Sequence, residues 1–164
     1  DDAQICIAID KYRERFAVQG LYENEIYPGV AKMLADLRAE GKKLAIASSK
    51  PTLFVEQILD HFEIRAYFDY IVGSNMDGTR SRKEEVVEEA LRQMLPAGMT
   101  PHEKRDAVAM VGDRKFDIEG ACAHGITSVG VSFGYAQEGE LEQAGADFIV
   151  DSVKALFDVL TLQS

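Results

Sequence analysis

Two aspartates after an apolar segment are the first residues of the sequence that could do chemistry. The segment VAMVGDRKFD contains Gly112 and Asp113, and Asp117 follows shortly afterwards. If a strand ends here and a helix begins, both carboxylates can face one point, and Gly112 allows a sharp exit from the sheet. Carboxylate oxygens are ligands that Mg²⁺ prefers, so the pattern predicts a Mg²⁺ site. The alternative is that Asp113 caps the helix and Asp117 favours its dipole.

Serine and lysine side chains follow two earlier apolar segments. LAIASSKP places Ser48 and Ser49 between a predicted strand and a helix that should begin at Pro51. Hydroxyls and free backbone N–H groups at that point can bind a phosphoryl group, although a serine helix cap is the alternative. Lys83 follows the segment FDYIVGS, and its ammonium could neutralise a substrate phosphate and a neighbouring carboxylate. A single lysine at a helix start is usually only solvated.

Short apolar segments alternate with amphipathic patterns along most of the chain. The predicted strands are 43–48, 68–74, 107–113, 127–134 and 148–152, and the predicted helices are 30–40, 52–62, 84–95, 116–125, 138–145 and 153–162. Alternating strands and helices imply parallel pairing, so we predict an α/β fold with a Rossmann-like, doubly wound parallel sheet. Ligands of such sheets bind at the carboxyl ends of the strands, where the polar residues above would lie. Tyr135 could border the mouth of this site.

Composition limits the classes of function. The chain has 164 residues, 46% of them hydrophobic and 28% charged, which fits one folded domain. Its net charge of −10 argues against nucleic acid as a partner, whereas a phosphate ester can be bound if a cation offsets the charge locally. No apolar run is long enough to cross a membrane. Cys6 and Cys122 lie far apart, which favours a reducing, cytoplasmic location over a disulfide framework.

The order of the polar residues resembles a known family. Ser48, Lys83 and the pair Asp113 and Asp117 are similar in order and placement to the second, third and fourth motifs of the haloacid dehalogenase superfamily. The segments YPGV, LAIASSKP, DGTRSRKEEV, VGDRKFD and FGYAQEGEL resemble the phosphoglycolate-phosphatase-like branch. The resemblance implies a Mg²⁺-dependent phosphatase that hydrolyses a small phosphorylated metabolite through an aspartyl-phosphate.

The resemblance also implies roles for these residues. Ser48, Ser49 and Lys83 would bind the phosphoryl oxygens, Asp113 would hold Mg²⁺, and Asp117 would orient the metal's water or Lys83. Two other functions stay open. One is a phosphomutase, and the other is a noncatalytic binding or regulatory module of the same fold. A dehalogenase needs no Mg²⁺ and fits the aspartate pair less well.

The family's first motif, DxDGT, supplies the nucleophilic aspartate and is not found in this sequence. The segment Asp77-Gly78-Thr79 has Asn75 two positions before the aspartate, and an amide cannot form an aspartyl-phosphate, so we predict a turn there. The family's nucleophile strand lies between the strands that here end in Ser48 and Asp113. We therefore expect a gap in the middle of the sheet, and we predict that the natural protein has a strand that fills it.

The domain prediction follows from the same resemblance. Residues 1–22 would be the C-terminal part of a helical cap, with its last helix over 3–19, and residues 23–164 would be the α/β core without its first strand. The natural start of the protein is expected upstream of Asp1.

Overall fold

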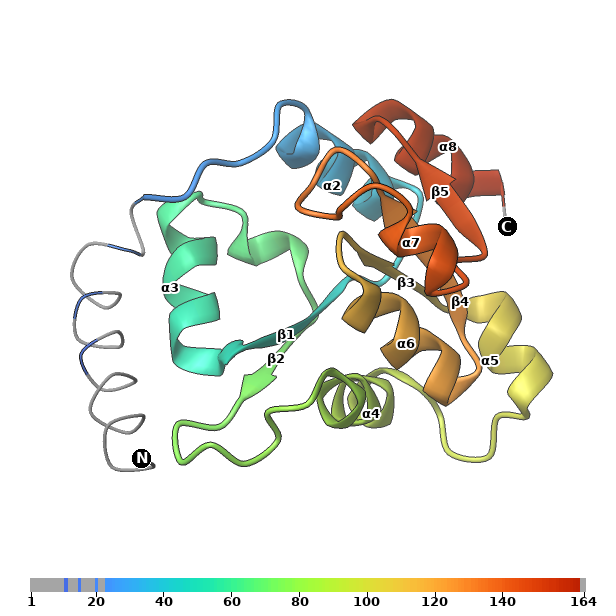
Figure 1. Ribbon diagram of the computed structural model, residues 1–164, viewed down its shortest axis with the longest axis horizontal. Coiled ribbons are helices and arrows are strands. Elements are labelled where there is room, and N and C mark those ends of the chain that lie inside the picture. The colour runs from blue at the N-terminus through green and yellow to red at the C-terminus, as the bar shows by residue number, and fades with distance from the viewer. Residues whose placement is uncertain (1–10, 12–14, 16–19, 21–22, 163–164) are drawn as a thin grey trace.

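The computed structural model describes Lys11, Arg15, Gly20 and residues 23–162 and has the predicted α/β architecture. Its strands are β1 (Ala45–Pro51), β2 (Tyr70–Ser74), β3 (Ala109–Gly112), β4 (Thr127–Val131) and β5 (Phe148–Val150). Its helices are α2 (Val30–Ala39), α3 (Thr52–His61), α4 (Lys83–Met94), α5 (Pro101–Ala107), α6 (Lys115–His124), α7 (Glu140–Gln143) and α8 (Val153–Leu162), with a 3₁₀ turn, η2 (Arg65–Tyr67). The predicted fold class is confirmed (Figure 1).

The strands form two parallel sheets, with β1 paired to β2 and the remaining strands in the order β3, β4, β5. Between β1 and β3 lies a cavity of about 400 Å³, lined by Ala45–Ala47 on one side and Val108–Val111 on the other. We call this cavity the inter-sheet slot. Its position is the one at which the sequence predicted a gap in the sheet.

Burial along the strands shows how the slot affects the core. β4, which is paired on both edges, is buried along its whole length, whereas all four residues of β3 are only half-buried. Strands in the middle of a parallel sheet are normally buried on both faces. The edges of β1 and β3 that face each other form no backbone hydrogen bonds across the slot, because the two strands belong to different sheets.

Two pairs of helices hold the two sheets together. On one face, α4 packs over β1 and β2 and contacts α6, which packs over β3 and β4. On the other face, α2 contacts α8 and contributes to two core clusters, one with β4 and β5 and one with α3. The residues in these helix contacts are apolar and buried: Met33, Leu34, Leu37, Val87, Leu91, Ala121 and Leu156.

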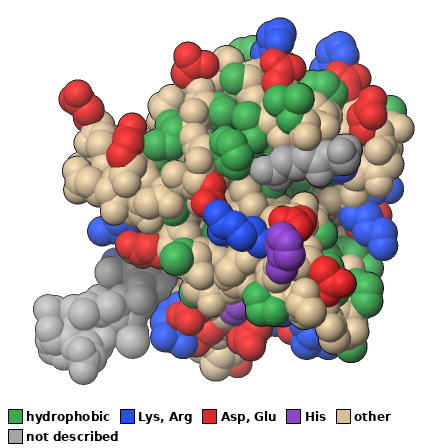
Figure 2. Space-filling view, turned by 90° about the vertical axis from the view of Figure 1, so that its right-hand side faces the viewer, with side chains coloured by type: hydrophobic (Ala, Val, Ile, Leu, Met, Phe, Trp, Pro, Cys, Tyr) green, Lys and Arg blue, Asp and Glu red, His purple; other side chains and the backbone are tan. Residues whose placement is uncertain are grey.

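β5 is the outer strand of the larger sheet, and it exposes Phe148 and Ile149. Figure 2 shows the side of the molecule that carries β5 and α8, with hydrophobic side chains gathered in the upper half of that view. β5 has only three residues, so it offers few unpaired backbone groups to another strand.

The structure differs from the predicted elements mainly at α5 and at the end of β1. α5 was not among the predicted helices, because it buries no residue and therefore lacks an apolar period. Its signal is a capping box, in which Thr100 and Glu103 bond each other's backbone N–H groups, with Pro101 in the first turn. In addition, β1 continues to Pro51, beyond the predicted strand end at residue 48, and Pro51 is the N-cap of α3, which begins at Thr52.

The predicted cap segment, residues 1–22, lies outside the described residues except for Lys11, Arg15 and Gly20. Its assignment to a cap, and the boundary at residue 23, stay predictions. Within the part of the chain that the structure describes, no helix is long and apolar enough to cross a membrane.

The inter-sheet slot leads to a test of the missing strand. We predict that a protein of residues 1–164 binds an apolar fluorescent dye, because the slot presents apolar side chains and unpaired strand edges. A longer protein that includes the predicted strand should bind much less dye and should melt at a higher temperature, because that strand would fill the slot. Equal dye fluorescence and equal melting temperatures in the two proteins would contradict this prediction.

Candidate active site

Lys83 is the first residue of α4, and its ammonium group contacts elements on both sides of the inter-sheet slot. Its Nζ donates a hydrogen bond of 2.8 Å to the carbonyl oxygen of Ala47 in β1 and lies 2.9 Å from Oδ1 of Asp117 in α6. The Lys83 and Asp117 side chains are only 15% and 10% exposed, so this ion pair is largely shielded from water. The sequence placed each residue in the segment that follows a strand, and the structure brings the two into contact.

The loop before α4 places Lys83 at this point. β2 ends at Ser74, and the chain turns over Asn75–Thr79, where the Asn75 N–H bonds the Thr79 carbonyl and Gly78 has a φ of 86°. The Asp77 carboxylate accepts hydrogen bonds from the hydroxyl and the backbone N–H of Thr79, and these bonds lower its pKa. The predicted turn is confirmed, and the Asp77 carboxylate is engaged within it.

Asp117 has a capping role as well as its ion pair. The N-cap of α6 is Arg114, and its backbone N–H donates to Oδ2 of Asp117 at 3.2 Å. Both carboxylate oxygens of Asp117 are therefore engaged, one by Lys83 and one by Arg114. The alternative considered for Asp117 was only a favourable effect on the helix dipole, and the structure shows instead that it completes the capping box of α6 and pairs with Lys83.

Asp113 lies just before α6 and does not cap it. Its Oδ2 accepts the backbone N–H of Tyr135 at 2.9 Å, in the loop that follows β4. Among the described residues, its Oδ1 has no hydrogen-bond partner. Asp113 is thus held in place through one oxygen while the other stays available.

Two glycines make room for the two aspartates. A Cβ added at Gly112 would overlap the side chain of Asp117, and a Cβ added at Gly134 would overlap that of Asp113. From the sequence, Gly112 was expected to allow a sharp exit from the sheet. The structure gives a different reason, because Gly112 is still in register with Gly130 of β4 and is needed for close approach of the carboxylate.

Ser48 follows Ala47, the residue whose carbonyl holds Lys83. The β1–β2 register shifts between Ala47 and Pro51, so the segment in between leaves the regular ladder. The Ser48 hydroxyl accepts the backbone N–H of Lys50 at 3.1 Å and does not cap α3, whose N-cap is Pro51. Ser49 is exposed. The serines are therefore placed at the same edge as Lys83, without a direct bond to either aspartate among the described hydrogen bonds.

Glu140, which was not singled out from the sequence, forms hydrogen bonds that join the loops of this edge. Oε1 of Glu140, at the start of α7, accepts from Arg114 Nε at 2.8 Å and from the backbone N–H of Lys115 at 2.9 Å, and Oε2 accepts from the Gln137 N–H at 3.1 Å. These donors lower the pKa of Glu140 to about 2, with the Lys115 N–H as the largest cause. The Arg114 and Glu140 side chains come together from positions 26 residues apart, which no local pattern indicates.

The fit of a metal ion depends mainly on Asp113. Among the described residues, no group of three or more His, Cys, Asp and Glu side chains could hold a metal ion. Mg²⁺ is commonly bound by only one or two carboxylates together with water and phosphate oxygens, and Asp113 offers one hard oxygen of that kind. Asp117 could contribute only by exchanging one of its present partners. The predicted metal role of both residues stays a prediction.

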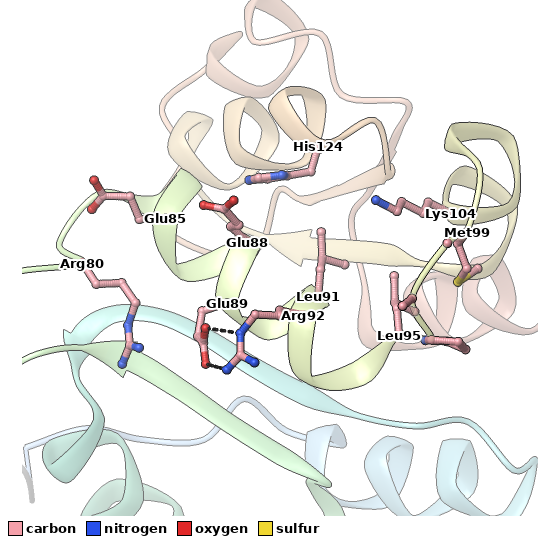
Figure 3. A pocket seen from close by; sticks show the side chains of 13 residues that line it. Arg80, Glu85, Glu88, Glu89, Leu91, Arg92, Leu95, Met99, Lys104 and His124 are labelled. Carbon is pink, nitrogen blue, oxygen red and sulfur yellow. Dashed lines mark hydrogen bonds and ion pairs between the residues drawn. The ribbon is translucent and has the colours of Figure 1, made fainter.

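A separate pocket of about 750 Å³ lies along the outer face of α4. Figure 3 shows the Glu89–Arg92 ion pair on its α4 side, with His124 of α6 and Lys104 of α5 across from Arg80. None of Ser48, Lys83, Asp113 and Asp117 lines this pocket. It is therefore distinct from the candidate active site.

The geometry can be compared with known proteins. Residues 1–131 match the family model described as haloacid dehalogenase-like hydrolase. A 5'-nucleotidase of Pseudomonas aeruginosa is 37% identical over 98% of this chain and 69% of its own length. A tyrosine-protein kinase, PtkA, of Mycobacterium tuberculosis is 39% identical over 87% of this chain and 44% of its own length. A phosphoglycolate phosphatase of Salmonella typhi is 33% identical over 93% and 57%, respectively.

A solved structure is also similar to this chain. The crystal structure of a protein described as a predicted phosphatase from Clostridium acetobutylicum superposes with a TM-score of 0.90 and 40% identity, over 99% of this chain and 72% of that one. The present chain spans between 44% and 69% of the length of the curated relatives named above.

The Lys83–Asp117 pair can be tested by a double-mutant cycle in the full-length protein. Lys83→Met would leave the Asp117 carboxylate buried without a cation, so we predict a loss of about 3–5 kcal/mol in the free energy of unfolding, measured in urea. Adding Asp117→Asn should recover part of the loss, because the amide carries no charge. The control is Lys32→Met, in an exposed ion pair of α2, which should cost less than about 1 kcal/mol. A Lys83→Met loss no larger than this control would contradict the prediction.

The Glu140 contacts predict a pH dependence. The pKa of Glu140 is lowered from 4.5 to about 2, so its stabilising contribution is present above about pH 4.5 and is lost as the pH falls towards 2. We predict that Glu140→Gln lowers the melting temperature by a constant amount above pH 5, and that the difference from the unchanged protein shrinks below pH 4.5. Thermal melts by circular dichroism measure it. Glu138→Gln, at an exposed carboxylate nearby, is the control, and an equal effect there would count against the specific role of Glu140.

Proposed function

The chain belongs to the haloacid dehalogenase-like hydrolase family, and on this basis we propose that the full-length protein is a Mg²⁺-dependent phosphatase of small phosphate monoesters. The observation that carries the proposal is the Lys83 ammonium, which the Ala47 carbonyl and Asp117 hold at the carboxyl edge of the sheet. Two of the relatives named above, the 5'-nucleotidase and the phosphoglycolate phosphatase, bear the names of enzymes that act on phosphate monoesters.

Lys83 and Ser48 are proposed to bind the phosphoryl group. An ammonium has three N–H donors, and Lys83 uses two of them for Ala47 and Asp117, so the third can bind a phosphoryl oxygen. The Ser48 hydroxyl accepts from Lys50 and can donate its own hydrogen to a second phosphoryl oxygen. Ser49, exposed beside it, is proposed to add a donor at the same edge. These donors would neutralise the charge that builds up on the phosphoryl group during transfer.

Asp113 is proposed to hold Mg²⁺ through the oxygen that does not bind Tyr135. The bound cation would offset negative charge on the phosphate. Asp117 is proposed to act on Lys83, because both of its oxygens are engaged and one of them orients the ammonium. The predicted role of Asp117 as a second metal ligand is kept as an alternative.

The nucleophile is proposed to come from a strand that fills the inter-sheet slot. A parallel strand between β1 and β3 would pair with both inner edges and would end beside Ser48, Lys83 and Asp113. A carboxylate at its end would attack phosphorus, release the alcohol and form an aspartyl-phosphate, which water would then hydrolyse. Apolar residues on both sides of the slot support this proposal, since they suit a buried strand.

The role of Asp113 can be tested in the full-length protein. We predict that Asp113→Asn lowers Mg²⁺-dependent hydrolysis of p-nitrophenyl phosphate by at least about 100-fold, because the cation would lose its protein carboxylate. Asp151→Asn, at an exposed aspartate just after β5, is the matched control and should keep the activity of the unchanged protein. Full activity in the presence of a chelator, or unchanged activity of Asp113→Asn, would refute the proposed metal role.

A second measurement separates the enzyme from a noncatalytic module. A protein of residues 1–164 should show no turnover, since it contains no DxD motif. If the full-length protein is also inactive while it still binds phosphate, the binding-module alternative gains support over the phosphatase.

A further inference from the structure

Two exposed tyrosines lie at the loop that holds Asp113: the backbone N–H of Tyr135 binds this carboxylate, and Tyr27 packs on Phe133 of the same loop. We propose that Tyr135 and Tyr27 form an aromatic subsite that binds a planar ring in the alcohol part of the substrate. The proposal rests on the proposed phosphatase function and narrows its substrate class to phosphate monoesters whose alcohol carries an aromatic ring, such as a nucleoside monophosphate.

The position of Tyr135 is fixed by its backbone. Its N–H donates to Oδ2 of Asp113, and Gly134 lies so close to Asp113 that a Cβ at that glycine would overlap the carboxylate. The ring itself is 79% exposed. Tyr135 therefore presents a free aromatic surface from a main chain that is attached to the candidate metal ligand.

Tyr27, just before α2, is held in place by an aromatic contact. Its ring packs edge-on against Phe133, with centroids 5.4 Å apart and an interplanar angle of 78°, and it remains 41% exposed. Phe133 stands two residues before Tyr135, whose backbone N–H binds Asp113, so Tyr27 packs on the loop that carries Tyr135.

The neighbouring exposed aromatic residue, Phe116, has a different environment. The Arg114 guanidinium and the Lys115 ammonium lie 5.9 Å and 5.3 Å from the centroid of its ring. Cations at these distances already interact with the aromatic ring. Phe116 is therefore not included in the subsite.

Exposed apolar side chains at this edge could instead contact another part of the protein. Leu53 and Met76 are also exposed, and they follow β1 and β2 at the other end of the same edge. A covering domain would rest on all of these residues alike. The side chains are aromatic on the Asp113 side and aliphatic on the other, which favours a ring-binding role for the tyrosines. Leu53 supplies a matched control.

The test compares two substrates in the full-length protein. Stacking of a base on an aromatic side chain contributes enough that its removal costs about tenfold in affinity. We expect Tyr135→Leu to lower the selectivity for adenosine 5'-monophosphate over glycerol 3-phosphate about tenfold, through KM and not kcat. Tyr135→Phe keeps the ring and should restore the selectivity. Leu53→Ala should leave the selectivity as in the unchanged protein.

Several results would overturn the proposal. An equal loss on both esters in Tyr135→Leu would show a role in positioning Asp113, and an equal change of selectivity in Leu53→Ala would show a general covering contact. If the unchanged protein hydrolyses neither ester, the phosphatase function fails. In that case calorimetric titration with adenosine 5'-monophosphate still decides the subsite: about tenfold weaker binding by Tyr135→Leu supports it, and equal binding refutes it.

Discussion

The ion pair between Lys83 and Asp117 is the interaction on which the rest of the candidate site depends. A shielded ammonium is stable only if nearby oxygens replace its water, and the Ala47 carbonyl and the Asp117 carboxylate do so. Space for the pair comes from glycines: Gly112 leaves room for Asp117, and a Cβ added at Gly120 would lie only 3.0 Å from Cγ of Lys83. These two glycines therefore allow both the close packing of α4 on α6 and the contact between Lys83 and Asp117.

The same lysine explains how a sheet in two parts can present one edge. Lys83 reaches from α4 to the end of β1 and to the start of α6, so it spans the carboxyl end of the inter-sheet slot. The helix contacts α4–α6 and α2–α8 bring the two sheets together on both faces, but they do not supply hydrogen-bond partners for the facing edges of β1 and β3. The facing edges of β1 and β3 thus have no backbone hydrogen bonds to each other. The positions of Ser48, Lys83 and Asp117 are instead determined by side-chain packing and charge.

The sequence predicted those features that depend on local pattern. Short apolar runs followed by polar residues gave the strands and put Ser48, Lys83 and Asp113 at their ends, because all parallel strands of a sheet share one carboxyl edge. It could not give the Glu140 contacts, which join distant loops, or the register shift after Ala47, which depends on β2. α5 has a clear capping signal but no buried face, so a search based on apolar periodicity passes over it.

The balance of charge at the edge gives the physical reason for proposing a divalent cation. Arg114 is paired with Glu140, and Lys83 with Asp117, so neither cation adds net positive charge to the site. Asp113 then adds a negative charge next to the proposed position of a dianionic phosphate, in a protein whose net charge is already −10. Lys83 can direct a hydrogen bond to the phosphate, but it cannot offset both the phosphate and Asp113. A Mg²⁺ ion between the two would do so, and the available oxygen of Asp113 is where such an ion would bind.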